Sequence, residues 1–461
     1  MCPGPWMVNM SGEKVKSSPV RQRPRNPAFM NDPNNNESNT FLNDIPSILF
    51  ILKATGLLPI YRMISNYELG PPNGIRRVYS MIAHALVHSM TIYNLYNLFS
   101  DGSTQLFYSY RETDNINYWI DILLCIVTYT TTVFICSKNS KSFLKILNDI
   151  LKVDEEISRK SSVNIVNNCG FAVKFIILIV IFQCYIIILK ILGINEPLTV
   201  PSYILIGFYS LQNGLSSIFI VFASILLRIV TVRFEYLNSV INGYTYREQK
   251  GKVRQRIRRL DNIRSPGSIP SQPPPMENFP DDSLFAFRMY NKLLRLYKAI
   301  NESCSLILVV YMGYAFYSIT TTTYNLFVQI TTQRDMSINV LQICFVLLFL
   351  HTTMLALLSR CSGQATDQAN ETSQILARVY GKSKEYQNIV DKFLTKSIKQ
   401  EVQFTAYGFF VIDNSTLFKI FSAVTTYLVI LIQFKQLEDS KMVEPTAITF
   451  IATTAKSNET I

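Results

Sequence analysis

The chain has 461 residues, of which 48% are hydrophobic and 16% charged, and it carries a formal net charge of +12. This length could form a few soluble domains, but the apolar residues are gathered into long runs, which is typical of a polytopic membrane protein. Most basic residues lie between these runs, where they serve as an orientation signal. The composition therefore argues against a soluble protein and against a nucleic-acid partner.

The N-terminal part precedes the long apolar runs. Its first forty residues contain no apolar stretch of the kind found in a signal peptide, so we expect no cleaved leader. We expect residues 1–40 to be a disordered cytoplasmic tail and residues 41–77 to form a helical segment on the cytoplasmic side. Within the latter, the apolar run Phe41–Ile60 is interrupted by two prolines, a glycine and a lysine. The alternative interpretation of this run is an eighth transmembrane span.

Seven later runs reach the roughly 18–20 residues that a helix needs to cross a bilayer. They are Val78–Phe99, Tyr118–Cys136, Phe171–Leu192, Tyr203–Leu227, Ser305–Ile330, Ile338–Leu358 and Leu417–Phe434. The sequence thus predicts an all-α bundle of seven transmembrane helices. Helices 1–4 occupy residues 78–230, helices 5 and 6 residues 305–358, and helix 7 residues 417–434, with an outer tail over residues 435–461.

The distribution of lysine and arginine predicts which side of the membrane each loop faces. The N-terminal stretch and the loops after the second, fourth and sixth spans contain 36 of these residues, whereas the other loops and the tail contain 5. Cytoplasmic loops carry the excess of positive charge. We therefore expect the N-terminus in the cytoplasm and the C-terminus outside.

Two long cytoplasmic segments follow from this orientation, residues 231–304 and residues 359–416. In the first, residues 247–283 are basic and then proline-rich, which predicts a disordered insert. Contact of its charges with phosphoinositides is the alternative. Apolar residues recur at helical spacing over Leu284–Ile300, and Gln374–Phe404 also has a helical pattern. We expect these helices to pack together as a collar beneath the membrane.

The sequence lacks the residue patterns of soluble enzymes. It has no phosphate-binding glycine loop, no G-x-S-x-G motif and only three histidines. His84 and His88 are four residues apart, but no carboxylate or cysteine lies near them in sequence, so we expect a structural or lipid-interface role and no metal site. His351 is expected to be a buried hydrogen-bonding residue. The eight cysteines contain no C-x-x-C pair, which favours buried free thiols. We expect neither an enzyme nor a cofactor.

The expected outer halves of the third to sixth spans are rich in aromatic, amide and hydroxyl side chains, and Trp119 and Asp121 lie near the outer end of the second span. Such walls suit a small polyol or sugar, which stacks on rings and forms hydrogen bonds at its rim. Part of the set must simply satisfy hydrogen bonds between helices. Asp121 has two open interpretations, a carboxylate that faces the bundle interior or water, and an interfacial residue beside an aromatic belt. The candidate ligand residues are Trp119, Asp121, Tyr185, Tyr209, Gln212, Asn213, Tyr317, Tyr324 and Gln342.

The seventh span differs from the others because polar residues lie at both of its ends. Its entry, Phe404–Ser415, interrupts the helical pattern, and Asp413 or Asn414 can cap the helix that follows. One face of this helix, repeated around a symmetry axis, would form a narrow tube with a ring of neutral amides that favours no particular cation. The residues of this face are Thr426, Val429, Ile430 and Gln433.

The same helix carries a resemblance to a known family. Thr426-Tyr427, followed by five apolar residues and Gln433-Phe434, is similar to the signature of the insect gustatory receptors. The upstream Gly408-Phe409-Phe410-x-Ile412-Asp413 also resembles that family. The resemblance is strongest over Glu401–Lys435, and the remainder of the chain agrees in architecture.

The resemblance implies a ligand-gated, non-selective cation channel in the plasma membrane of sensory neuron dendrites, related to the insect odorant receptors. It implies a homotetramer, or a heterotetramer with other gustatory receptors, whose seventh helices line a pore for monovalent cations and calcium within membrane lipid. Gln433 would lie at the constriction, Thr426 and Tyr427 would support the same helix, and Phe434 would pack near the outer mouth. A tastant pocket would occupy the outer half of each subunit.

The C-terminal segment also bears on the ligand. Gln403–Asn414 is similar to the branch of the family that detects fructose and related nutrients, although bitter-compound receptors share much of the C-terminus. A sugar such as fructose is therefore the expected ligand, with a bitter compound as the alternative. The chain departs from the family pattern by continuing from Lys435 to Ile461 and by its long insert between the fourth and fifth spans.

Two other classes of protein share parts of this pattern. A G-protein-coupled receptor also has seven spans, but it would need an outside N-terminus, and the D-R-Y and N-P-x-x-Y motifs do not occur at the ends of the third and seventh spans. A secondary transporter would favour paired broken helices in two similar halves, and the sequence shows no such repeat. Both alternatives are weaker than the channel.

The expected orientation can be tested by glycosylation. Asn458 begins the only N-x-S/T sequon expected outside, whereas those at Asn9, Asn36, Asn301, Asn370 and Asn414 should lie in the cytoplasm or at its membrane edge. Asn458→Gln should abolish the whole glycan mobility shift of the expressed protein. A glycan attached at Asn9, Asn36 or Asn370 would contradict the orientation.

Overall fold

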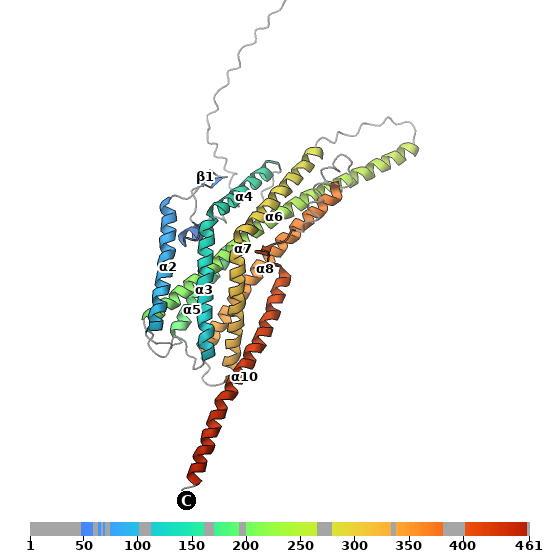
Figure 1. The fold of residues 1–461 in the computed structure, drawn as a ribbon. Helices are drawn as coiled ribbons and strands as arrows, with labels where there is room; N and C mark the ends of the chain where they lie inside the picture. Colours follow the sequence, from blue (N-terminus) through green and yellow to red (C-terminus); the bar gives the residue numbers. More distant parts are fainter. Residues whose placement is uncertain are drawn as a thin grey trace, which may run out of the picture. The chain divides into compact units, whose positions relative to one another are not determined.

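The computed structural model describes residues 48–58, 63–65, 68–69, 74–100, 112–160, 170–192, 200–264, 279–332, 338–380 and 402–458. These ranges are almost entirely helical (Figure 1). The expected tail over residues 1–40 lies outside them.

Seven long helices contain the seven expected spans. They are α2 (Gly74–Ser100), α3 (Glu112–Lys138), α5 (Gly170–Leu192), α6 (Val200–Arg264), α7 (Phe279–Thr332), α8 (Ile338–Tyr380) and α10 (Asn414–Asn458). Among the described residues, six helices are long and apolar enough to cross a membrane. The exception is α2, because polar side chains such as His84, His88 and Asn94 lower its hydropathy. The all-α transmembrane bundle is confirmed, while its sidedness stays a prediction.

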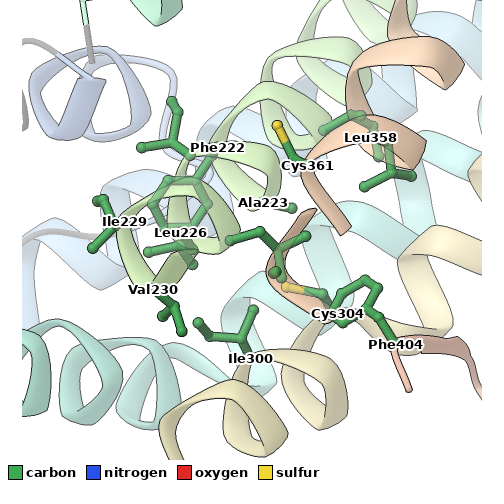
Figure 2. Packing of buried hydrophobic residues seen from close by; sticks show 14 of the residues in the cluster. Phe222, Ala223, Leu226, Ile229, Val230, Ile300, Cys304, Leu358, Cys361 and Phe404 are labelled. Atoms are coloured by element: carbon green, nitrogen blue, oxygen red, sulfur yellow. The ribbon is translucent and has the colours of Figure 1, made fainter. Parts of the chain in front are cut away.

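Helix α6 is the centre of the bundle. Its 65 residues contact α2, α3, α5, α7 and α8, and every side chain from residue 212 to residue 227 is buried. Figure 2 shows part of this core, in which Phe222 and Leu226 of α6 belong to the same buried cluster as Ile300 of α7 and Leu358 of α8. Close packing of this kind holds helices together where lipid removes the usual hydrophobic driving force.

Helix α4 (Ser140–Lys160) is not among the elements expected from the sequence. It is strongly amphipathic, and its apolar face, which includes Phe143, Ile146 and Ile150, is fully buried in the core. A search for long apolar runs misses such a helix, because its apolar residues recur once per turn and alternate with charged ones. Lys292 of α7 forms an ion pair with Glu156 on its outer side.

The insert between the fourth and fifth spans differs from the expectation. Residues 247–283 were expected to be disordered, but α6 continues to Arg264 and α7 begins at Phe279. Lysine, arginine, glutamine and leucine are good helix formers, and no proline occurs between residues 247 and 265, so the helix persists through the basic stretch. Residues 265–278 lie outside the described part.

The expected collar is described only in part. Helix α8 continues to Tyr380, residues 381–401 lie outside the described part, and after residues 402–404, which are not helical, a small hairpin of β3 (Thr405–Ala406) and β4 (Phe410–Val411) leads into α10. The inner parts of α6, α7 and α8 run side by side (Figure 1). They are joined by hydrogen bonds from Asn238 to Gln368 and between Tyr297 and Thr366.

Within the apolar run Phe41–Ile60, residues 48–54 are helical, and residues 41–47 lie outside the described part. Its side chains Ile48 and Leu52 are buried in the core. The chain then turns at Gly56, where φ is 72°, and the Ser80 hydroxyl donates a hydrogen bond to the Gly56 carbonyl oxygen. A two-stranded ribbon, β1 (Met63–Ser65) and β2 (Glu68–Leu69), follows.

The two histidines of α2 both contact Tyr129 of α3. A ring nitrogen of His84, Nδ1, lies 2.6 Å from the Tyr129 hydroxyl oxygen, and His88 packs against the same tyrosine ring with centroids 5.1 Å apart. Both histidines therefore help to join α2 to α3.

One buried ion pair fixes α4 to α6. The Arg233 guanidinium is completely buried and donates two hydrogen bonds to the Asp154 carboxylate, 2.8 Å from Nε to Oδ1 and 2.5 Å from Nη2 to Oδ2. Arg233 also donates to the carbonyl oxygen of Ile229. Because two hydrogen bonds join the guanidinium to the carboxylate, the ion pair fixes both the position and the rotation of α4.

Removing one partner of this pair should destabilise the protein more than removing both. Arg233→Met leaves a poorly solvated carboxylate, and we expect a loss of about 3 kcal/mol in the free energy of unfolding. The double variant Arg233→Met/Asp154→Leu should recover most of that loss. Thermal unfolding of the purified protein in detergent measures both, and a double variant as unstable as the single one would show that the charge imbalance is not the cause.

Candidate functional site

A buried polar cluster lies in the expected outer half of the bundle. The Tyr209 hydroxyl of α6 donates a hydrogen bond to Oδ2 of Asp121 on α3, at 2.5 Å. The Tyr314 hydroxyl of α7 lies 3.2 Å from that of Tyr209. Both tyrosines are almost fully buried. Of the two interpretations of Asp121, the structure selects the carboxylate that faces the bundle interior.

Two further helices close this cluster. The Lys190 ammonium of α5 lies 4.6 Å from the centroid of the Tyr209 ring, a distance at which a cation is attracted to an aromatic face. On the other side, the His351 ring of α8 meets Tyr314 edge-on, with centroids 5.2 Å apart. Residues from five helices therefore converge on Tyr209 and Tyr314.

Apolar side chains surround the polar centre. Trp119, Leu95, Leu124 and Ile126 pack against a small buried group that includes Ile122, Cys125 and Leu205 together with the two tyrosines. The cluster thus combines aromatic walls, one carboxylate and one ammonium in an otherwise apolar setting. This composition is typical of sites for small organic ligands.

Several buried polar atoms of this region have no hydrogen-bond partner within the described residues. They include Oδ1 of Asp121, both ring nitrogens of His351 and both side-chain amide atoms of Asn213. Each such atom costs about 1–3 kcal/mol when it is left unpaired. Among the described residues, His351 therefore lacks the side-chain hydrogen bonds expected of it. Atoms of this kind are available to a ligand with matching groups.

Two other candidate ligand residues, Gln212 and Tyr317, form hydrogen bonds to neighbouring helices. The Gln212 amide donates to Thr91 of α2, at 2.8 Å. The Tyr317 hydroxyl donates to the Asn117 carbonyl oxygen of α3, at 3.1 Å. These bonds join helices, as anticipated for part of the set.

Two candidates lie farther out. The exposed Tyr185 of α5 donates a hydrogen bond to Gln342 of α8 at 3.1 Å. Tyr324 is buried ten residues beyond Tyr314 on α7, roughly 15 Å along the helix.

Three members of the cluster were not among the candidates derived from the sequence. Lys190 carried the clearest signal, since a charged residue inside a span is usually functional or paired. Tyr314 precedes the chosen Tyr317 by one helical turn, and helical spacing alone cannot tell which of the two faces Asp121. His351 was expected to be buried, but its neighbour became known only from the packing.

The entry of α10 is capped as expected. The Asp413 carboxylate accepts hydrogen bonds from the Thr416 backbone amide, at 2.8 Å, and from the Ser415 hydroxyl, at 2.7 Å. Partial burial alone would raise the pKa of Asp413, but these hydrogen bonds and the nearby Lys419 charge outweigh it and lower the pKa. The carboxylate therefore stays ionised at neutral pH and stabilises the first turn.

Helix α10 packs on α7 and α8 along one side only. That side includes the buried Val424 and Lys435, and the Tyr427 ring meets Phe316 of α7 edge-on. The four expected pore residues, Thr426, Val429, Ile430 and Gln433, are all exposed on the single chain. Their role in lining a pore stays a prediction.

Comparisons with known proteins identify the same family. A family model described as "7tm Chemosensory receptor" matches residues 45–438. The chain is 56% identical over 461 residues to gustatory and pheromone receptor 32a of Drosophila melanogaster, covering 96% of this chain and 99% of that protein. It is 36% identical to gustatory receptor 68a of the same species, covering 72% of this chain and 79% of the relative.

Solved structures show the same fold. The insect olfactory receptor OR5 from Machilis hrabei matches with a TM-score of 0.53 at 12% identity, covering 86% of this chain and 99% of that receptor. The structure of that receptor in complex with eugenol matches with the same TM-score.

Proposed function

The chain belongs to the seven-transmembrane chemosensory receptor family, among the insect gustatory receptors, and we propose from this premise that it is a ligand-gated, non-selective cation channel. It would act in the plasma membrane of sensory neuron dendrites and pass monovalent cations and calcium. The assembly would be a tetramer, either of identical chains or with other gustatory receptors.

The observation that carries the channel proposal is the exposed face of α10. In a single chain this apolar helix is covered along one side only, and Gln433 is exposed within it. An amide facing hydrocarbon is costly, whereas an amide facing water or another subunit is not. Four such helices around an axis would place Gln433 at a water-filled constriction, with Val429 and Ile430 forming an apolar ring below it.

The polar cluster is the proposed ligand site. Oδ1 of Asp121 accepts no hydrogen bond within the described part of the chain, so it favours a ligand that donates one. The apolar packing around Tyr209 and Tyr314 favours a ligand with a substantial hydrophobic part. A small amphipathic compound with a hydroxyl or amine donor fits both features.

This ligand class differs from the sugar expected from the sequence. Two features support the change: mainly apolar side chains pack around Tyr209 and Tyr314, and the relative with 56% identity is named a gustatory and pheromone receptor. We therefore place a bitter or pheromone-like compound first. A sugar remains the second candidate, supported by the unpaired amide of Asn213.

Substitution in the cluster should weaken the response to the ligand without changing permeation. Tyr209→Phe removes the hydroxyl that positions Asp121, and Asp121→Asn removes the acceptor charge, so the half-maximal ligand concentration should rise about tenfold or more. Voltage clamp in oocytes, with panels of sugars and of bitter compounds, measures the effect. Tyr203→Phe, which removes an exposed hydroxyl from the same helix, is the matched control and should leave the response unchanged.

Substitution of Gln433 should change ion permeation without changing the response to the ligand. Gln433→Glu would place a ring of negative charge at the constriction and should shift the reversal potential in favour of divalent cations. The half-maximal ligand concentration should stay within about twofold, since the polar cluster is unchanged. A change in ligand sensitivity without a change in permeation would contradict the pore assignment.

A further inference from the structure

One lysine of α10 is buried although it lies near the end of a membrane span. Lys435 is 8% exposed, and it comes two residues after Gln433 in the span Asn414–Leu437. A lysine at such a position commonly extends along the helix to reach the lipid headgroups. Burying an ammonium group is costly unless the protein supplies partners for it. The burial of Lys435 therefore has to be compensated by its neighbours.

Neighbours of Lys435 lie in the last turns of α7. Its ammonium donates a hydrogen bond to the Thr331 hydroxyl oxygen, at 3.4 Å, and lies 5.8 Å from the centroid of the Phe327 ring. The Thr331 hydroxyl in turn donates to the Phe327 carbonyl oxygen, at 2.9 Å. The last turn of α7 contains no basic residue of its own, and a cation is favourable at a helix C-terminus. Lys435 thus supplies from α10 the positive charge that the last turn of α7 lacks.

Lys435 also continues the stripe of α10 that faces its own subunit. The stripe consists of buried or partly buried side chains at intervals of three or four residues: Leu417, Ile420, Val424, Leu428, Leu431 and Lys435. At roughly 100° per residue, all of them lie within roughly 60° of the direction of Lys435 around the helix. The stripe is therefore apolar along its length and ends in a charged side chain.

The expected pore residues lie on the other face of α10. Gln433 is roughly 160° from Lys435 around the helix, and Thr426 is roughly 180° from it. Both are exposed on the single chain. Apolar contacts have no preferred direction, so a small rotation of α10 changes little in the apolar stripe but would break the hydrogen bond of Lys435. Anchoring Lys435 on α7 therefore holds the Gln433 amide away from its own subunit.

The start of α10 is held separately, through the hairpin that precedes it. The side-chain oxygen of Asn301 on α7 accepts a hydrogen bond from the Thr405 amide, at 3.1 Å, and the Ser362 hydroxyl of α8 donates to the Ile412 carbonyl oxygen. Long helices curve and bend, so a contact at one end does not determine the orientation of side chains at the other. Lys435 supplies a second fixed point at the far end of the span.

We propose that Lys435 is the positioning residue that fixes the rotation of α10 at the C-terminal end of its span, through its contact with Thr331 and Phe327. This contact lies within one subunit and does not depend on assembly. Its consequence, that Gln433 is held toward the water-filled constriction, rests on the proposed function.

Labelling of introduced cysteines in the full-length chain, in membranes, tests the rotation. Gln433→Cys should react with a water-soluble maleimide, whereas Leu428→Cys, on the stripe that faces the subunit, should be protected. Adding Lys435→Met, which keeps an unbranched side chain and removes its charge, should lower the ratio of the two labelling rates about tenfold, the factor that a hydrogen bond to a charged group is worth. Mass spectrometry of the labelled peptides measures both rates. An unchanged ratio would overturn the inference.

Two further variants separate the contact from the charge and from folding. Thr331→Val keeps the shape of that side chain and the charge of Lys435 but removes the hydrogen-bond acceptor, so it should lower the same ratio. Lys435→Arg keeps a cationic donor and should restore the wild-type ratio. If Thr331→Val leaves the ratio unchanged, or if Lys435→Arg behaves as Lys435→Met does, the contact does not set the rotation.

The consequence for permeation is measured by voltage clamp. Lys435→Met and Thr331→Val should both shift the reversal potential in mixed monovalent and divalent solutions, with the half-maximal ligand concentration unchanged. Lys174→Met, which removes an exposed lysine of α5, is the charge-matched control and should leave the reversal potential unchanged. A shift with Lys435→Met and none with Thr331→Val would show that Lys435 acts through its charge alone, which overturns the inference.

Failure of this inference can be told apart from failure of the proposed function. If the wild-type chain conducts and position 433 is labelled, but neither Lys435→Met nor Thr331→Val has an effect, the role of Lys435 is removed and the channel is left intact. If the wild-type chain passes no current with the sugar and bitter-compound panels and position 433 is not labelled, the proposed function itself is removed.

Discussion

Polar side chains inside a membrane bundle are costly unless they are paired, and α6 forms a polar pair on each side of its buried core. In the expected outer half, Tyr209 is tied to Asp121 of α3. On the opposite side of the core, Arg233 is tied to Asp154 of α4. Between these two points, every residue of α6 from 212 to 227 is buried. The helix can therefore neither rotate nor slide without breaking a polar pair, and the other helices are positioned around it.

Helices α7 and α8 connect the polar cluster with the start of α10. Tyr314 and Asn301 both lie on α7, and His351 and Ser362 both lie on α8. One residue of each pair borders the cluster, and the other holds the hairpin that precedes α10. A ligand that changes the spacing of these two helices would move the base of the hairpin and, with it, the proposed pore helix. In the proposed channel, this would give gating a structural route built from two rigid elements.

The apolar spans were predictable because each exceeds the length of a bilayer crossing and is bounded by charged loops. Other features were not predictable in this way. Helix α4 has no long apolar run, since its partners are other helices and not lipid, and it is recognised only by its period of one apolar residue per turn. The basic stretch after residue 247 was expected to be disordered from its composition, but its residues are good helix formers that extend α6.

Within the candidate site, residue type was predictable but pairing was not. Asp121 and Tyr209 stood out as polar groups inside spans, yet their contact depends on how α3 and α6 are rotated. Lys190 and His351 joined the cluster only through packing.

Sequence alone determined the all-α class, the seven helices and the family, because these depend on the length and order of apolar runs and on a local motif. Only the tertiary structure decided which buried polar atoms are paired and which are left for a ligand, because that choice depends on helix rotation, which no local pattern encodes.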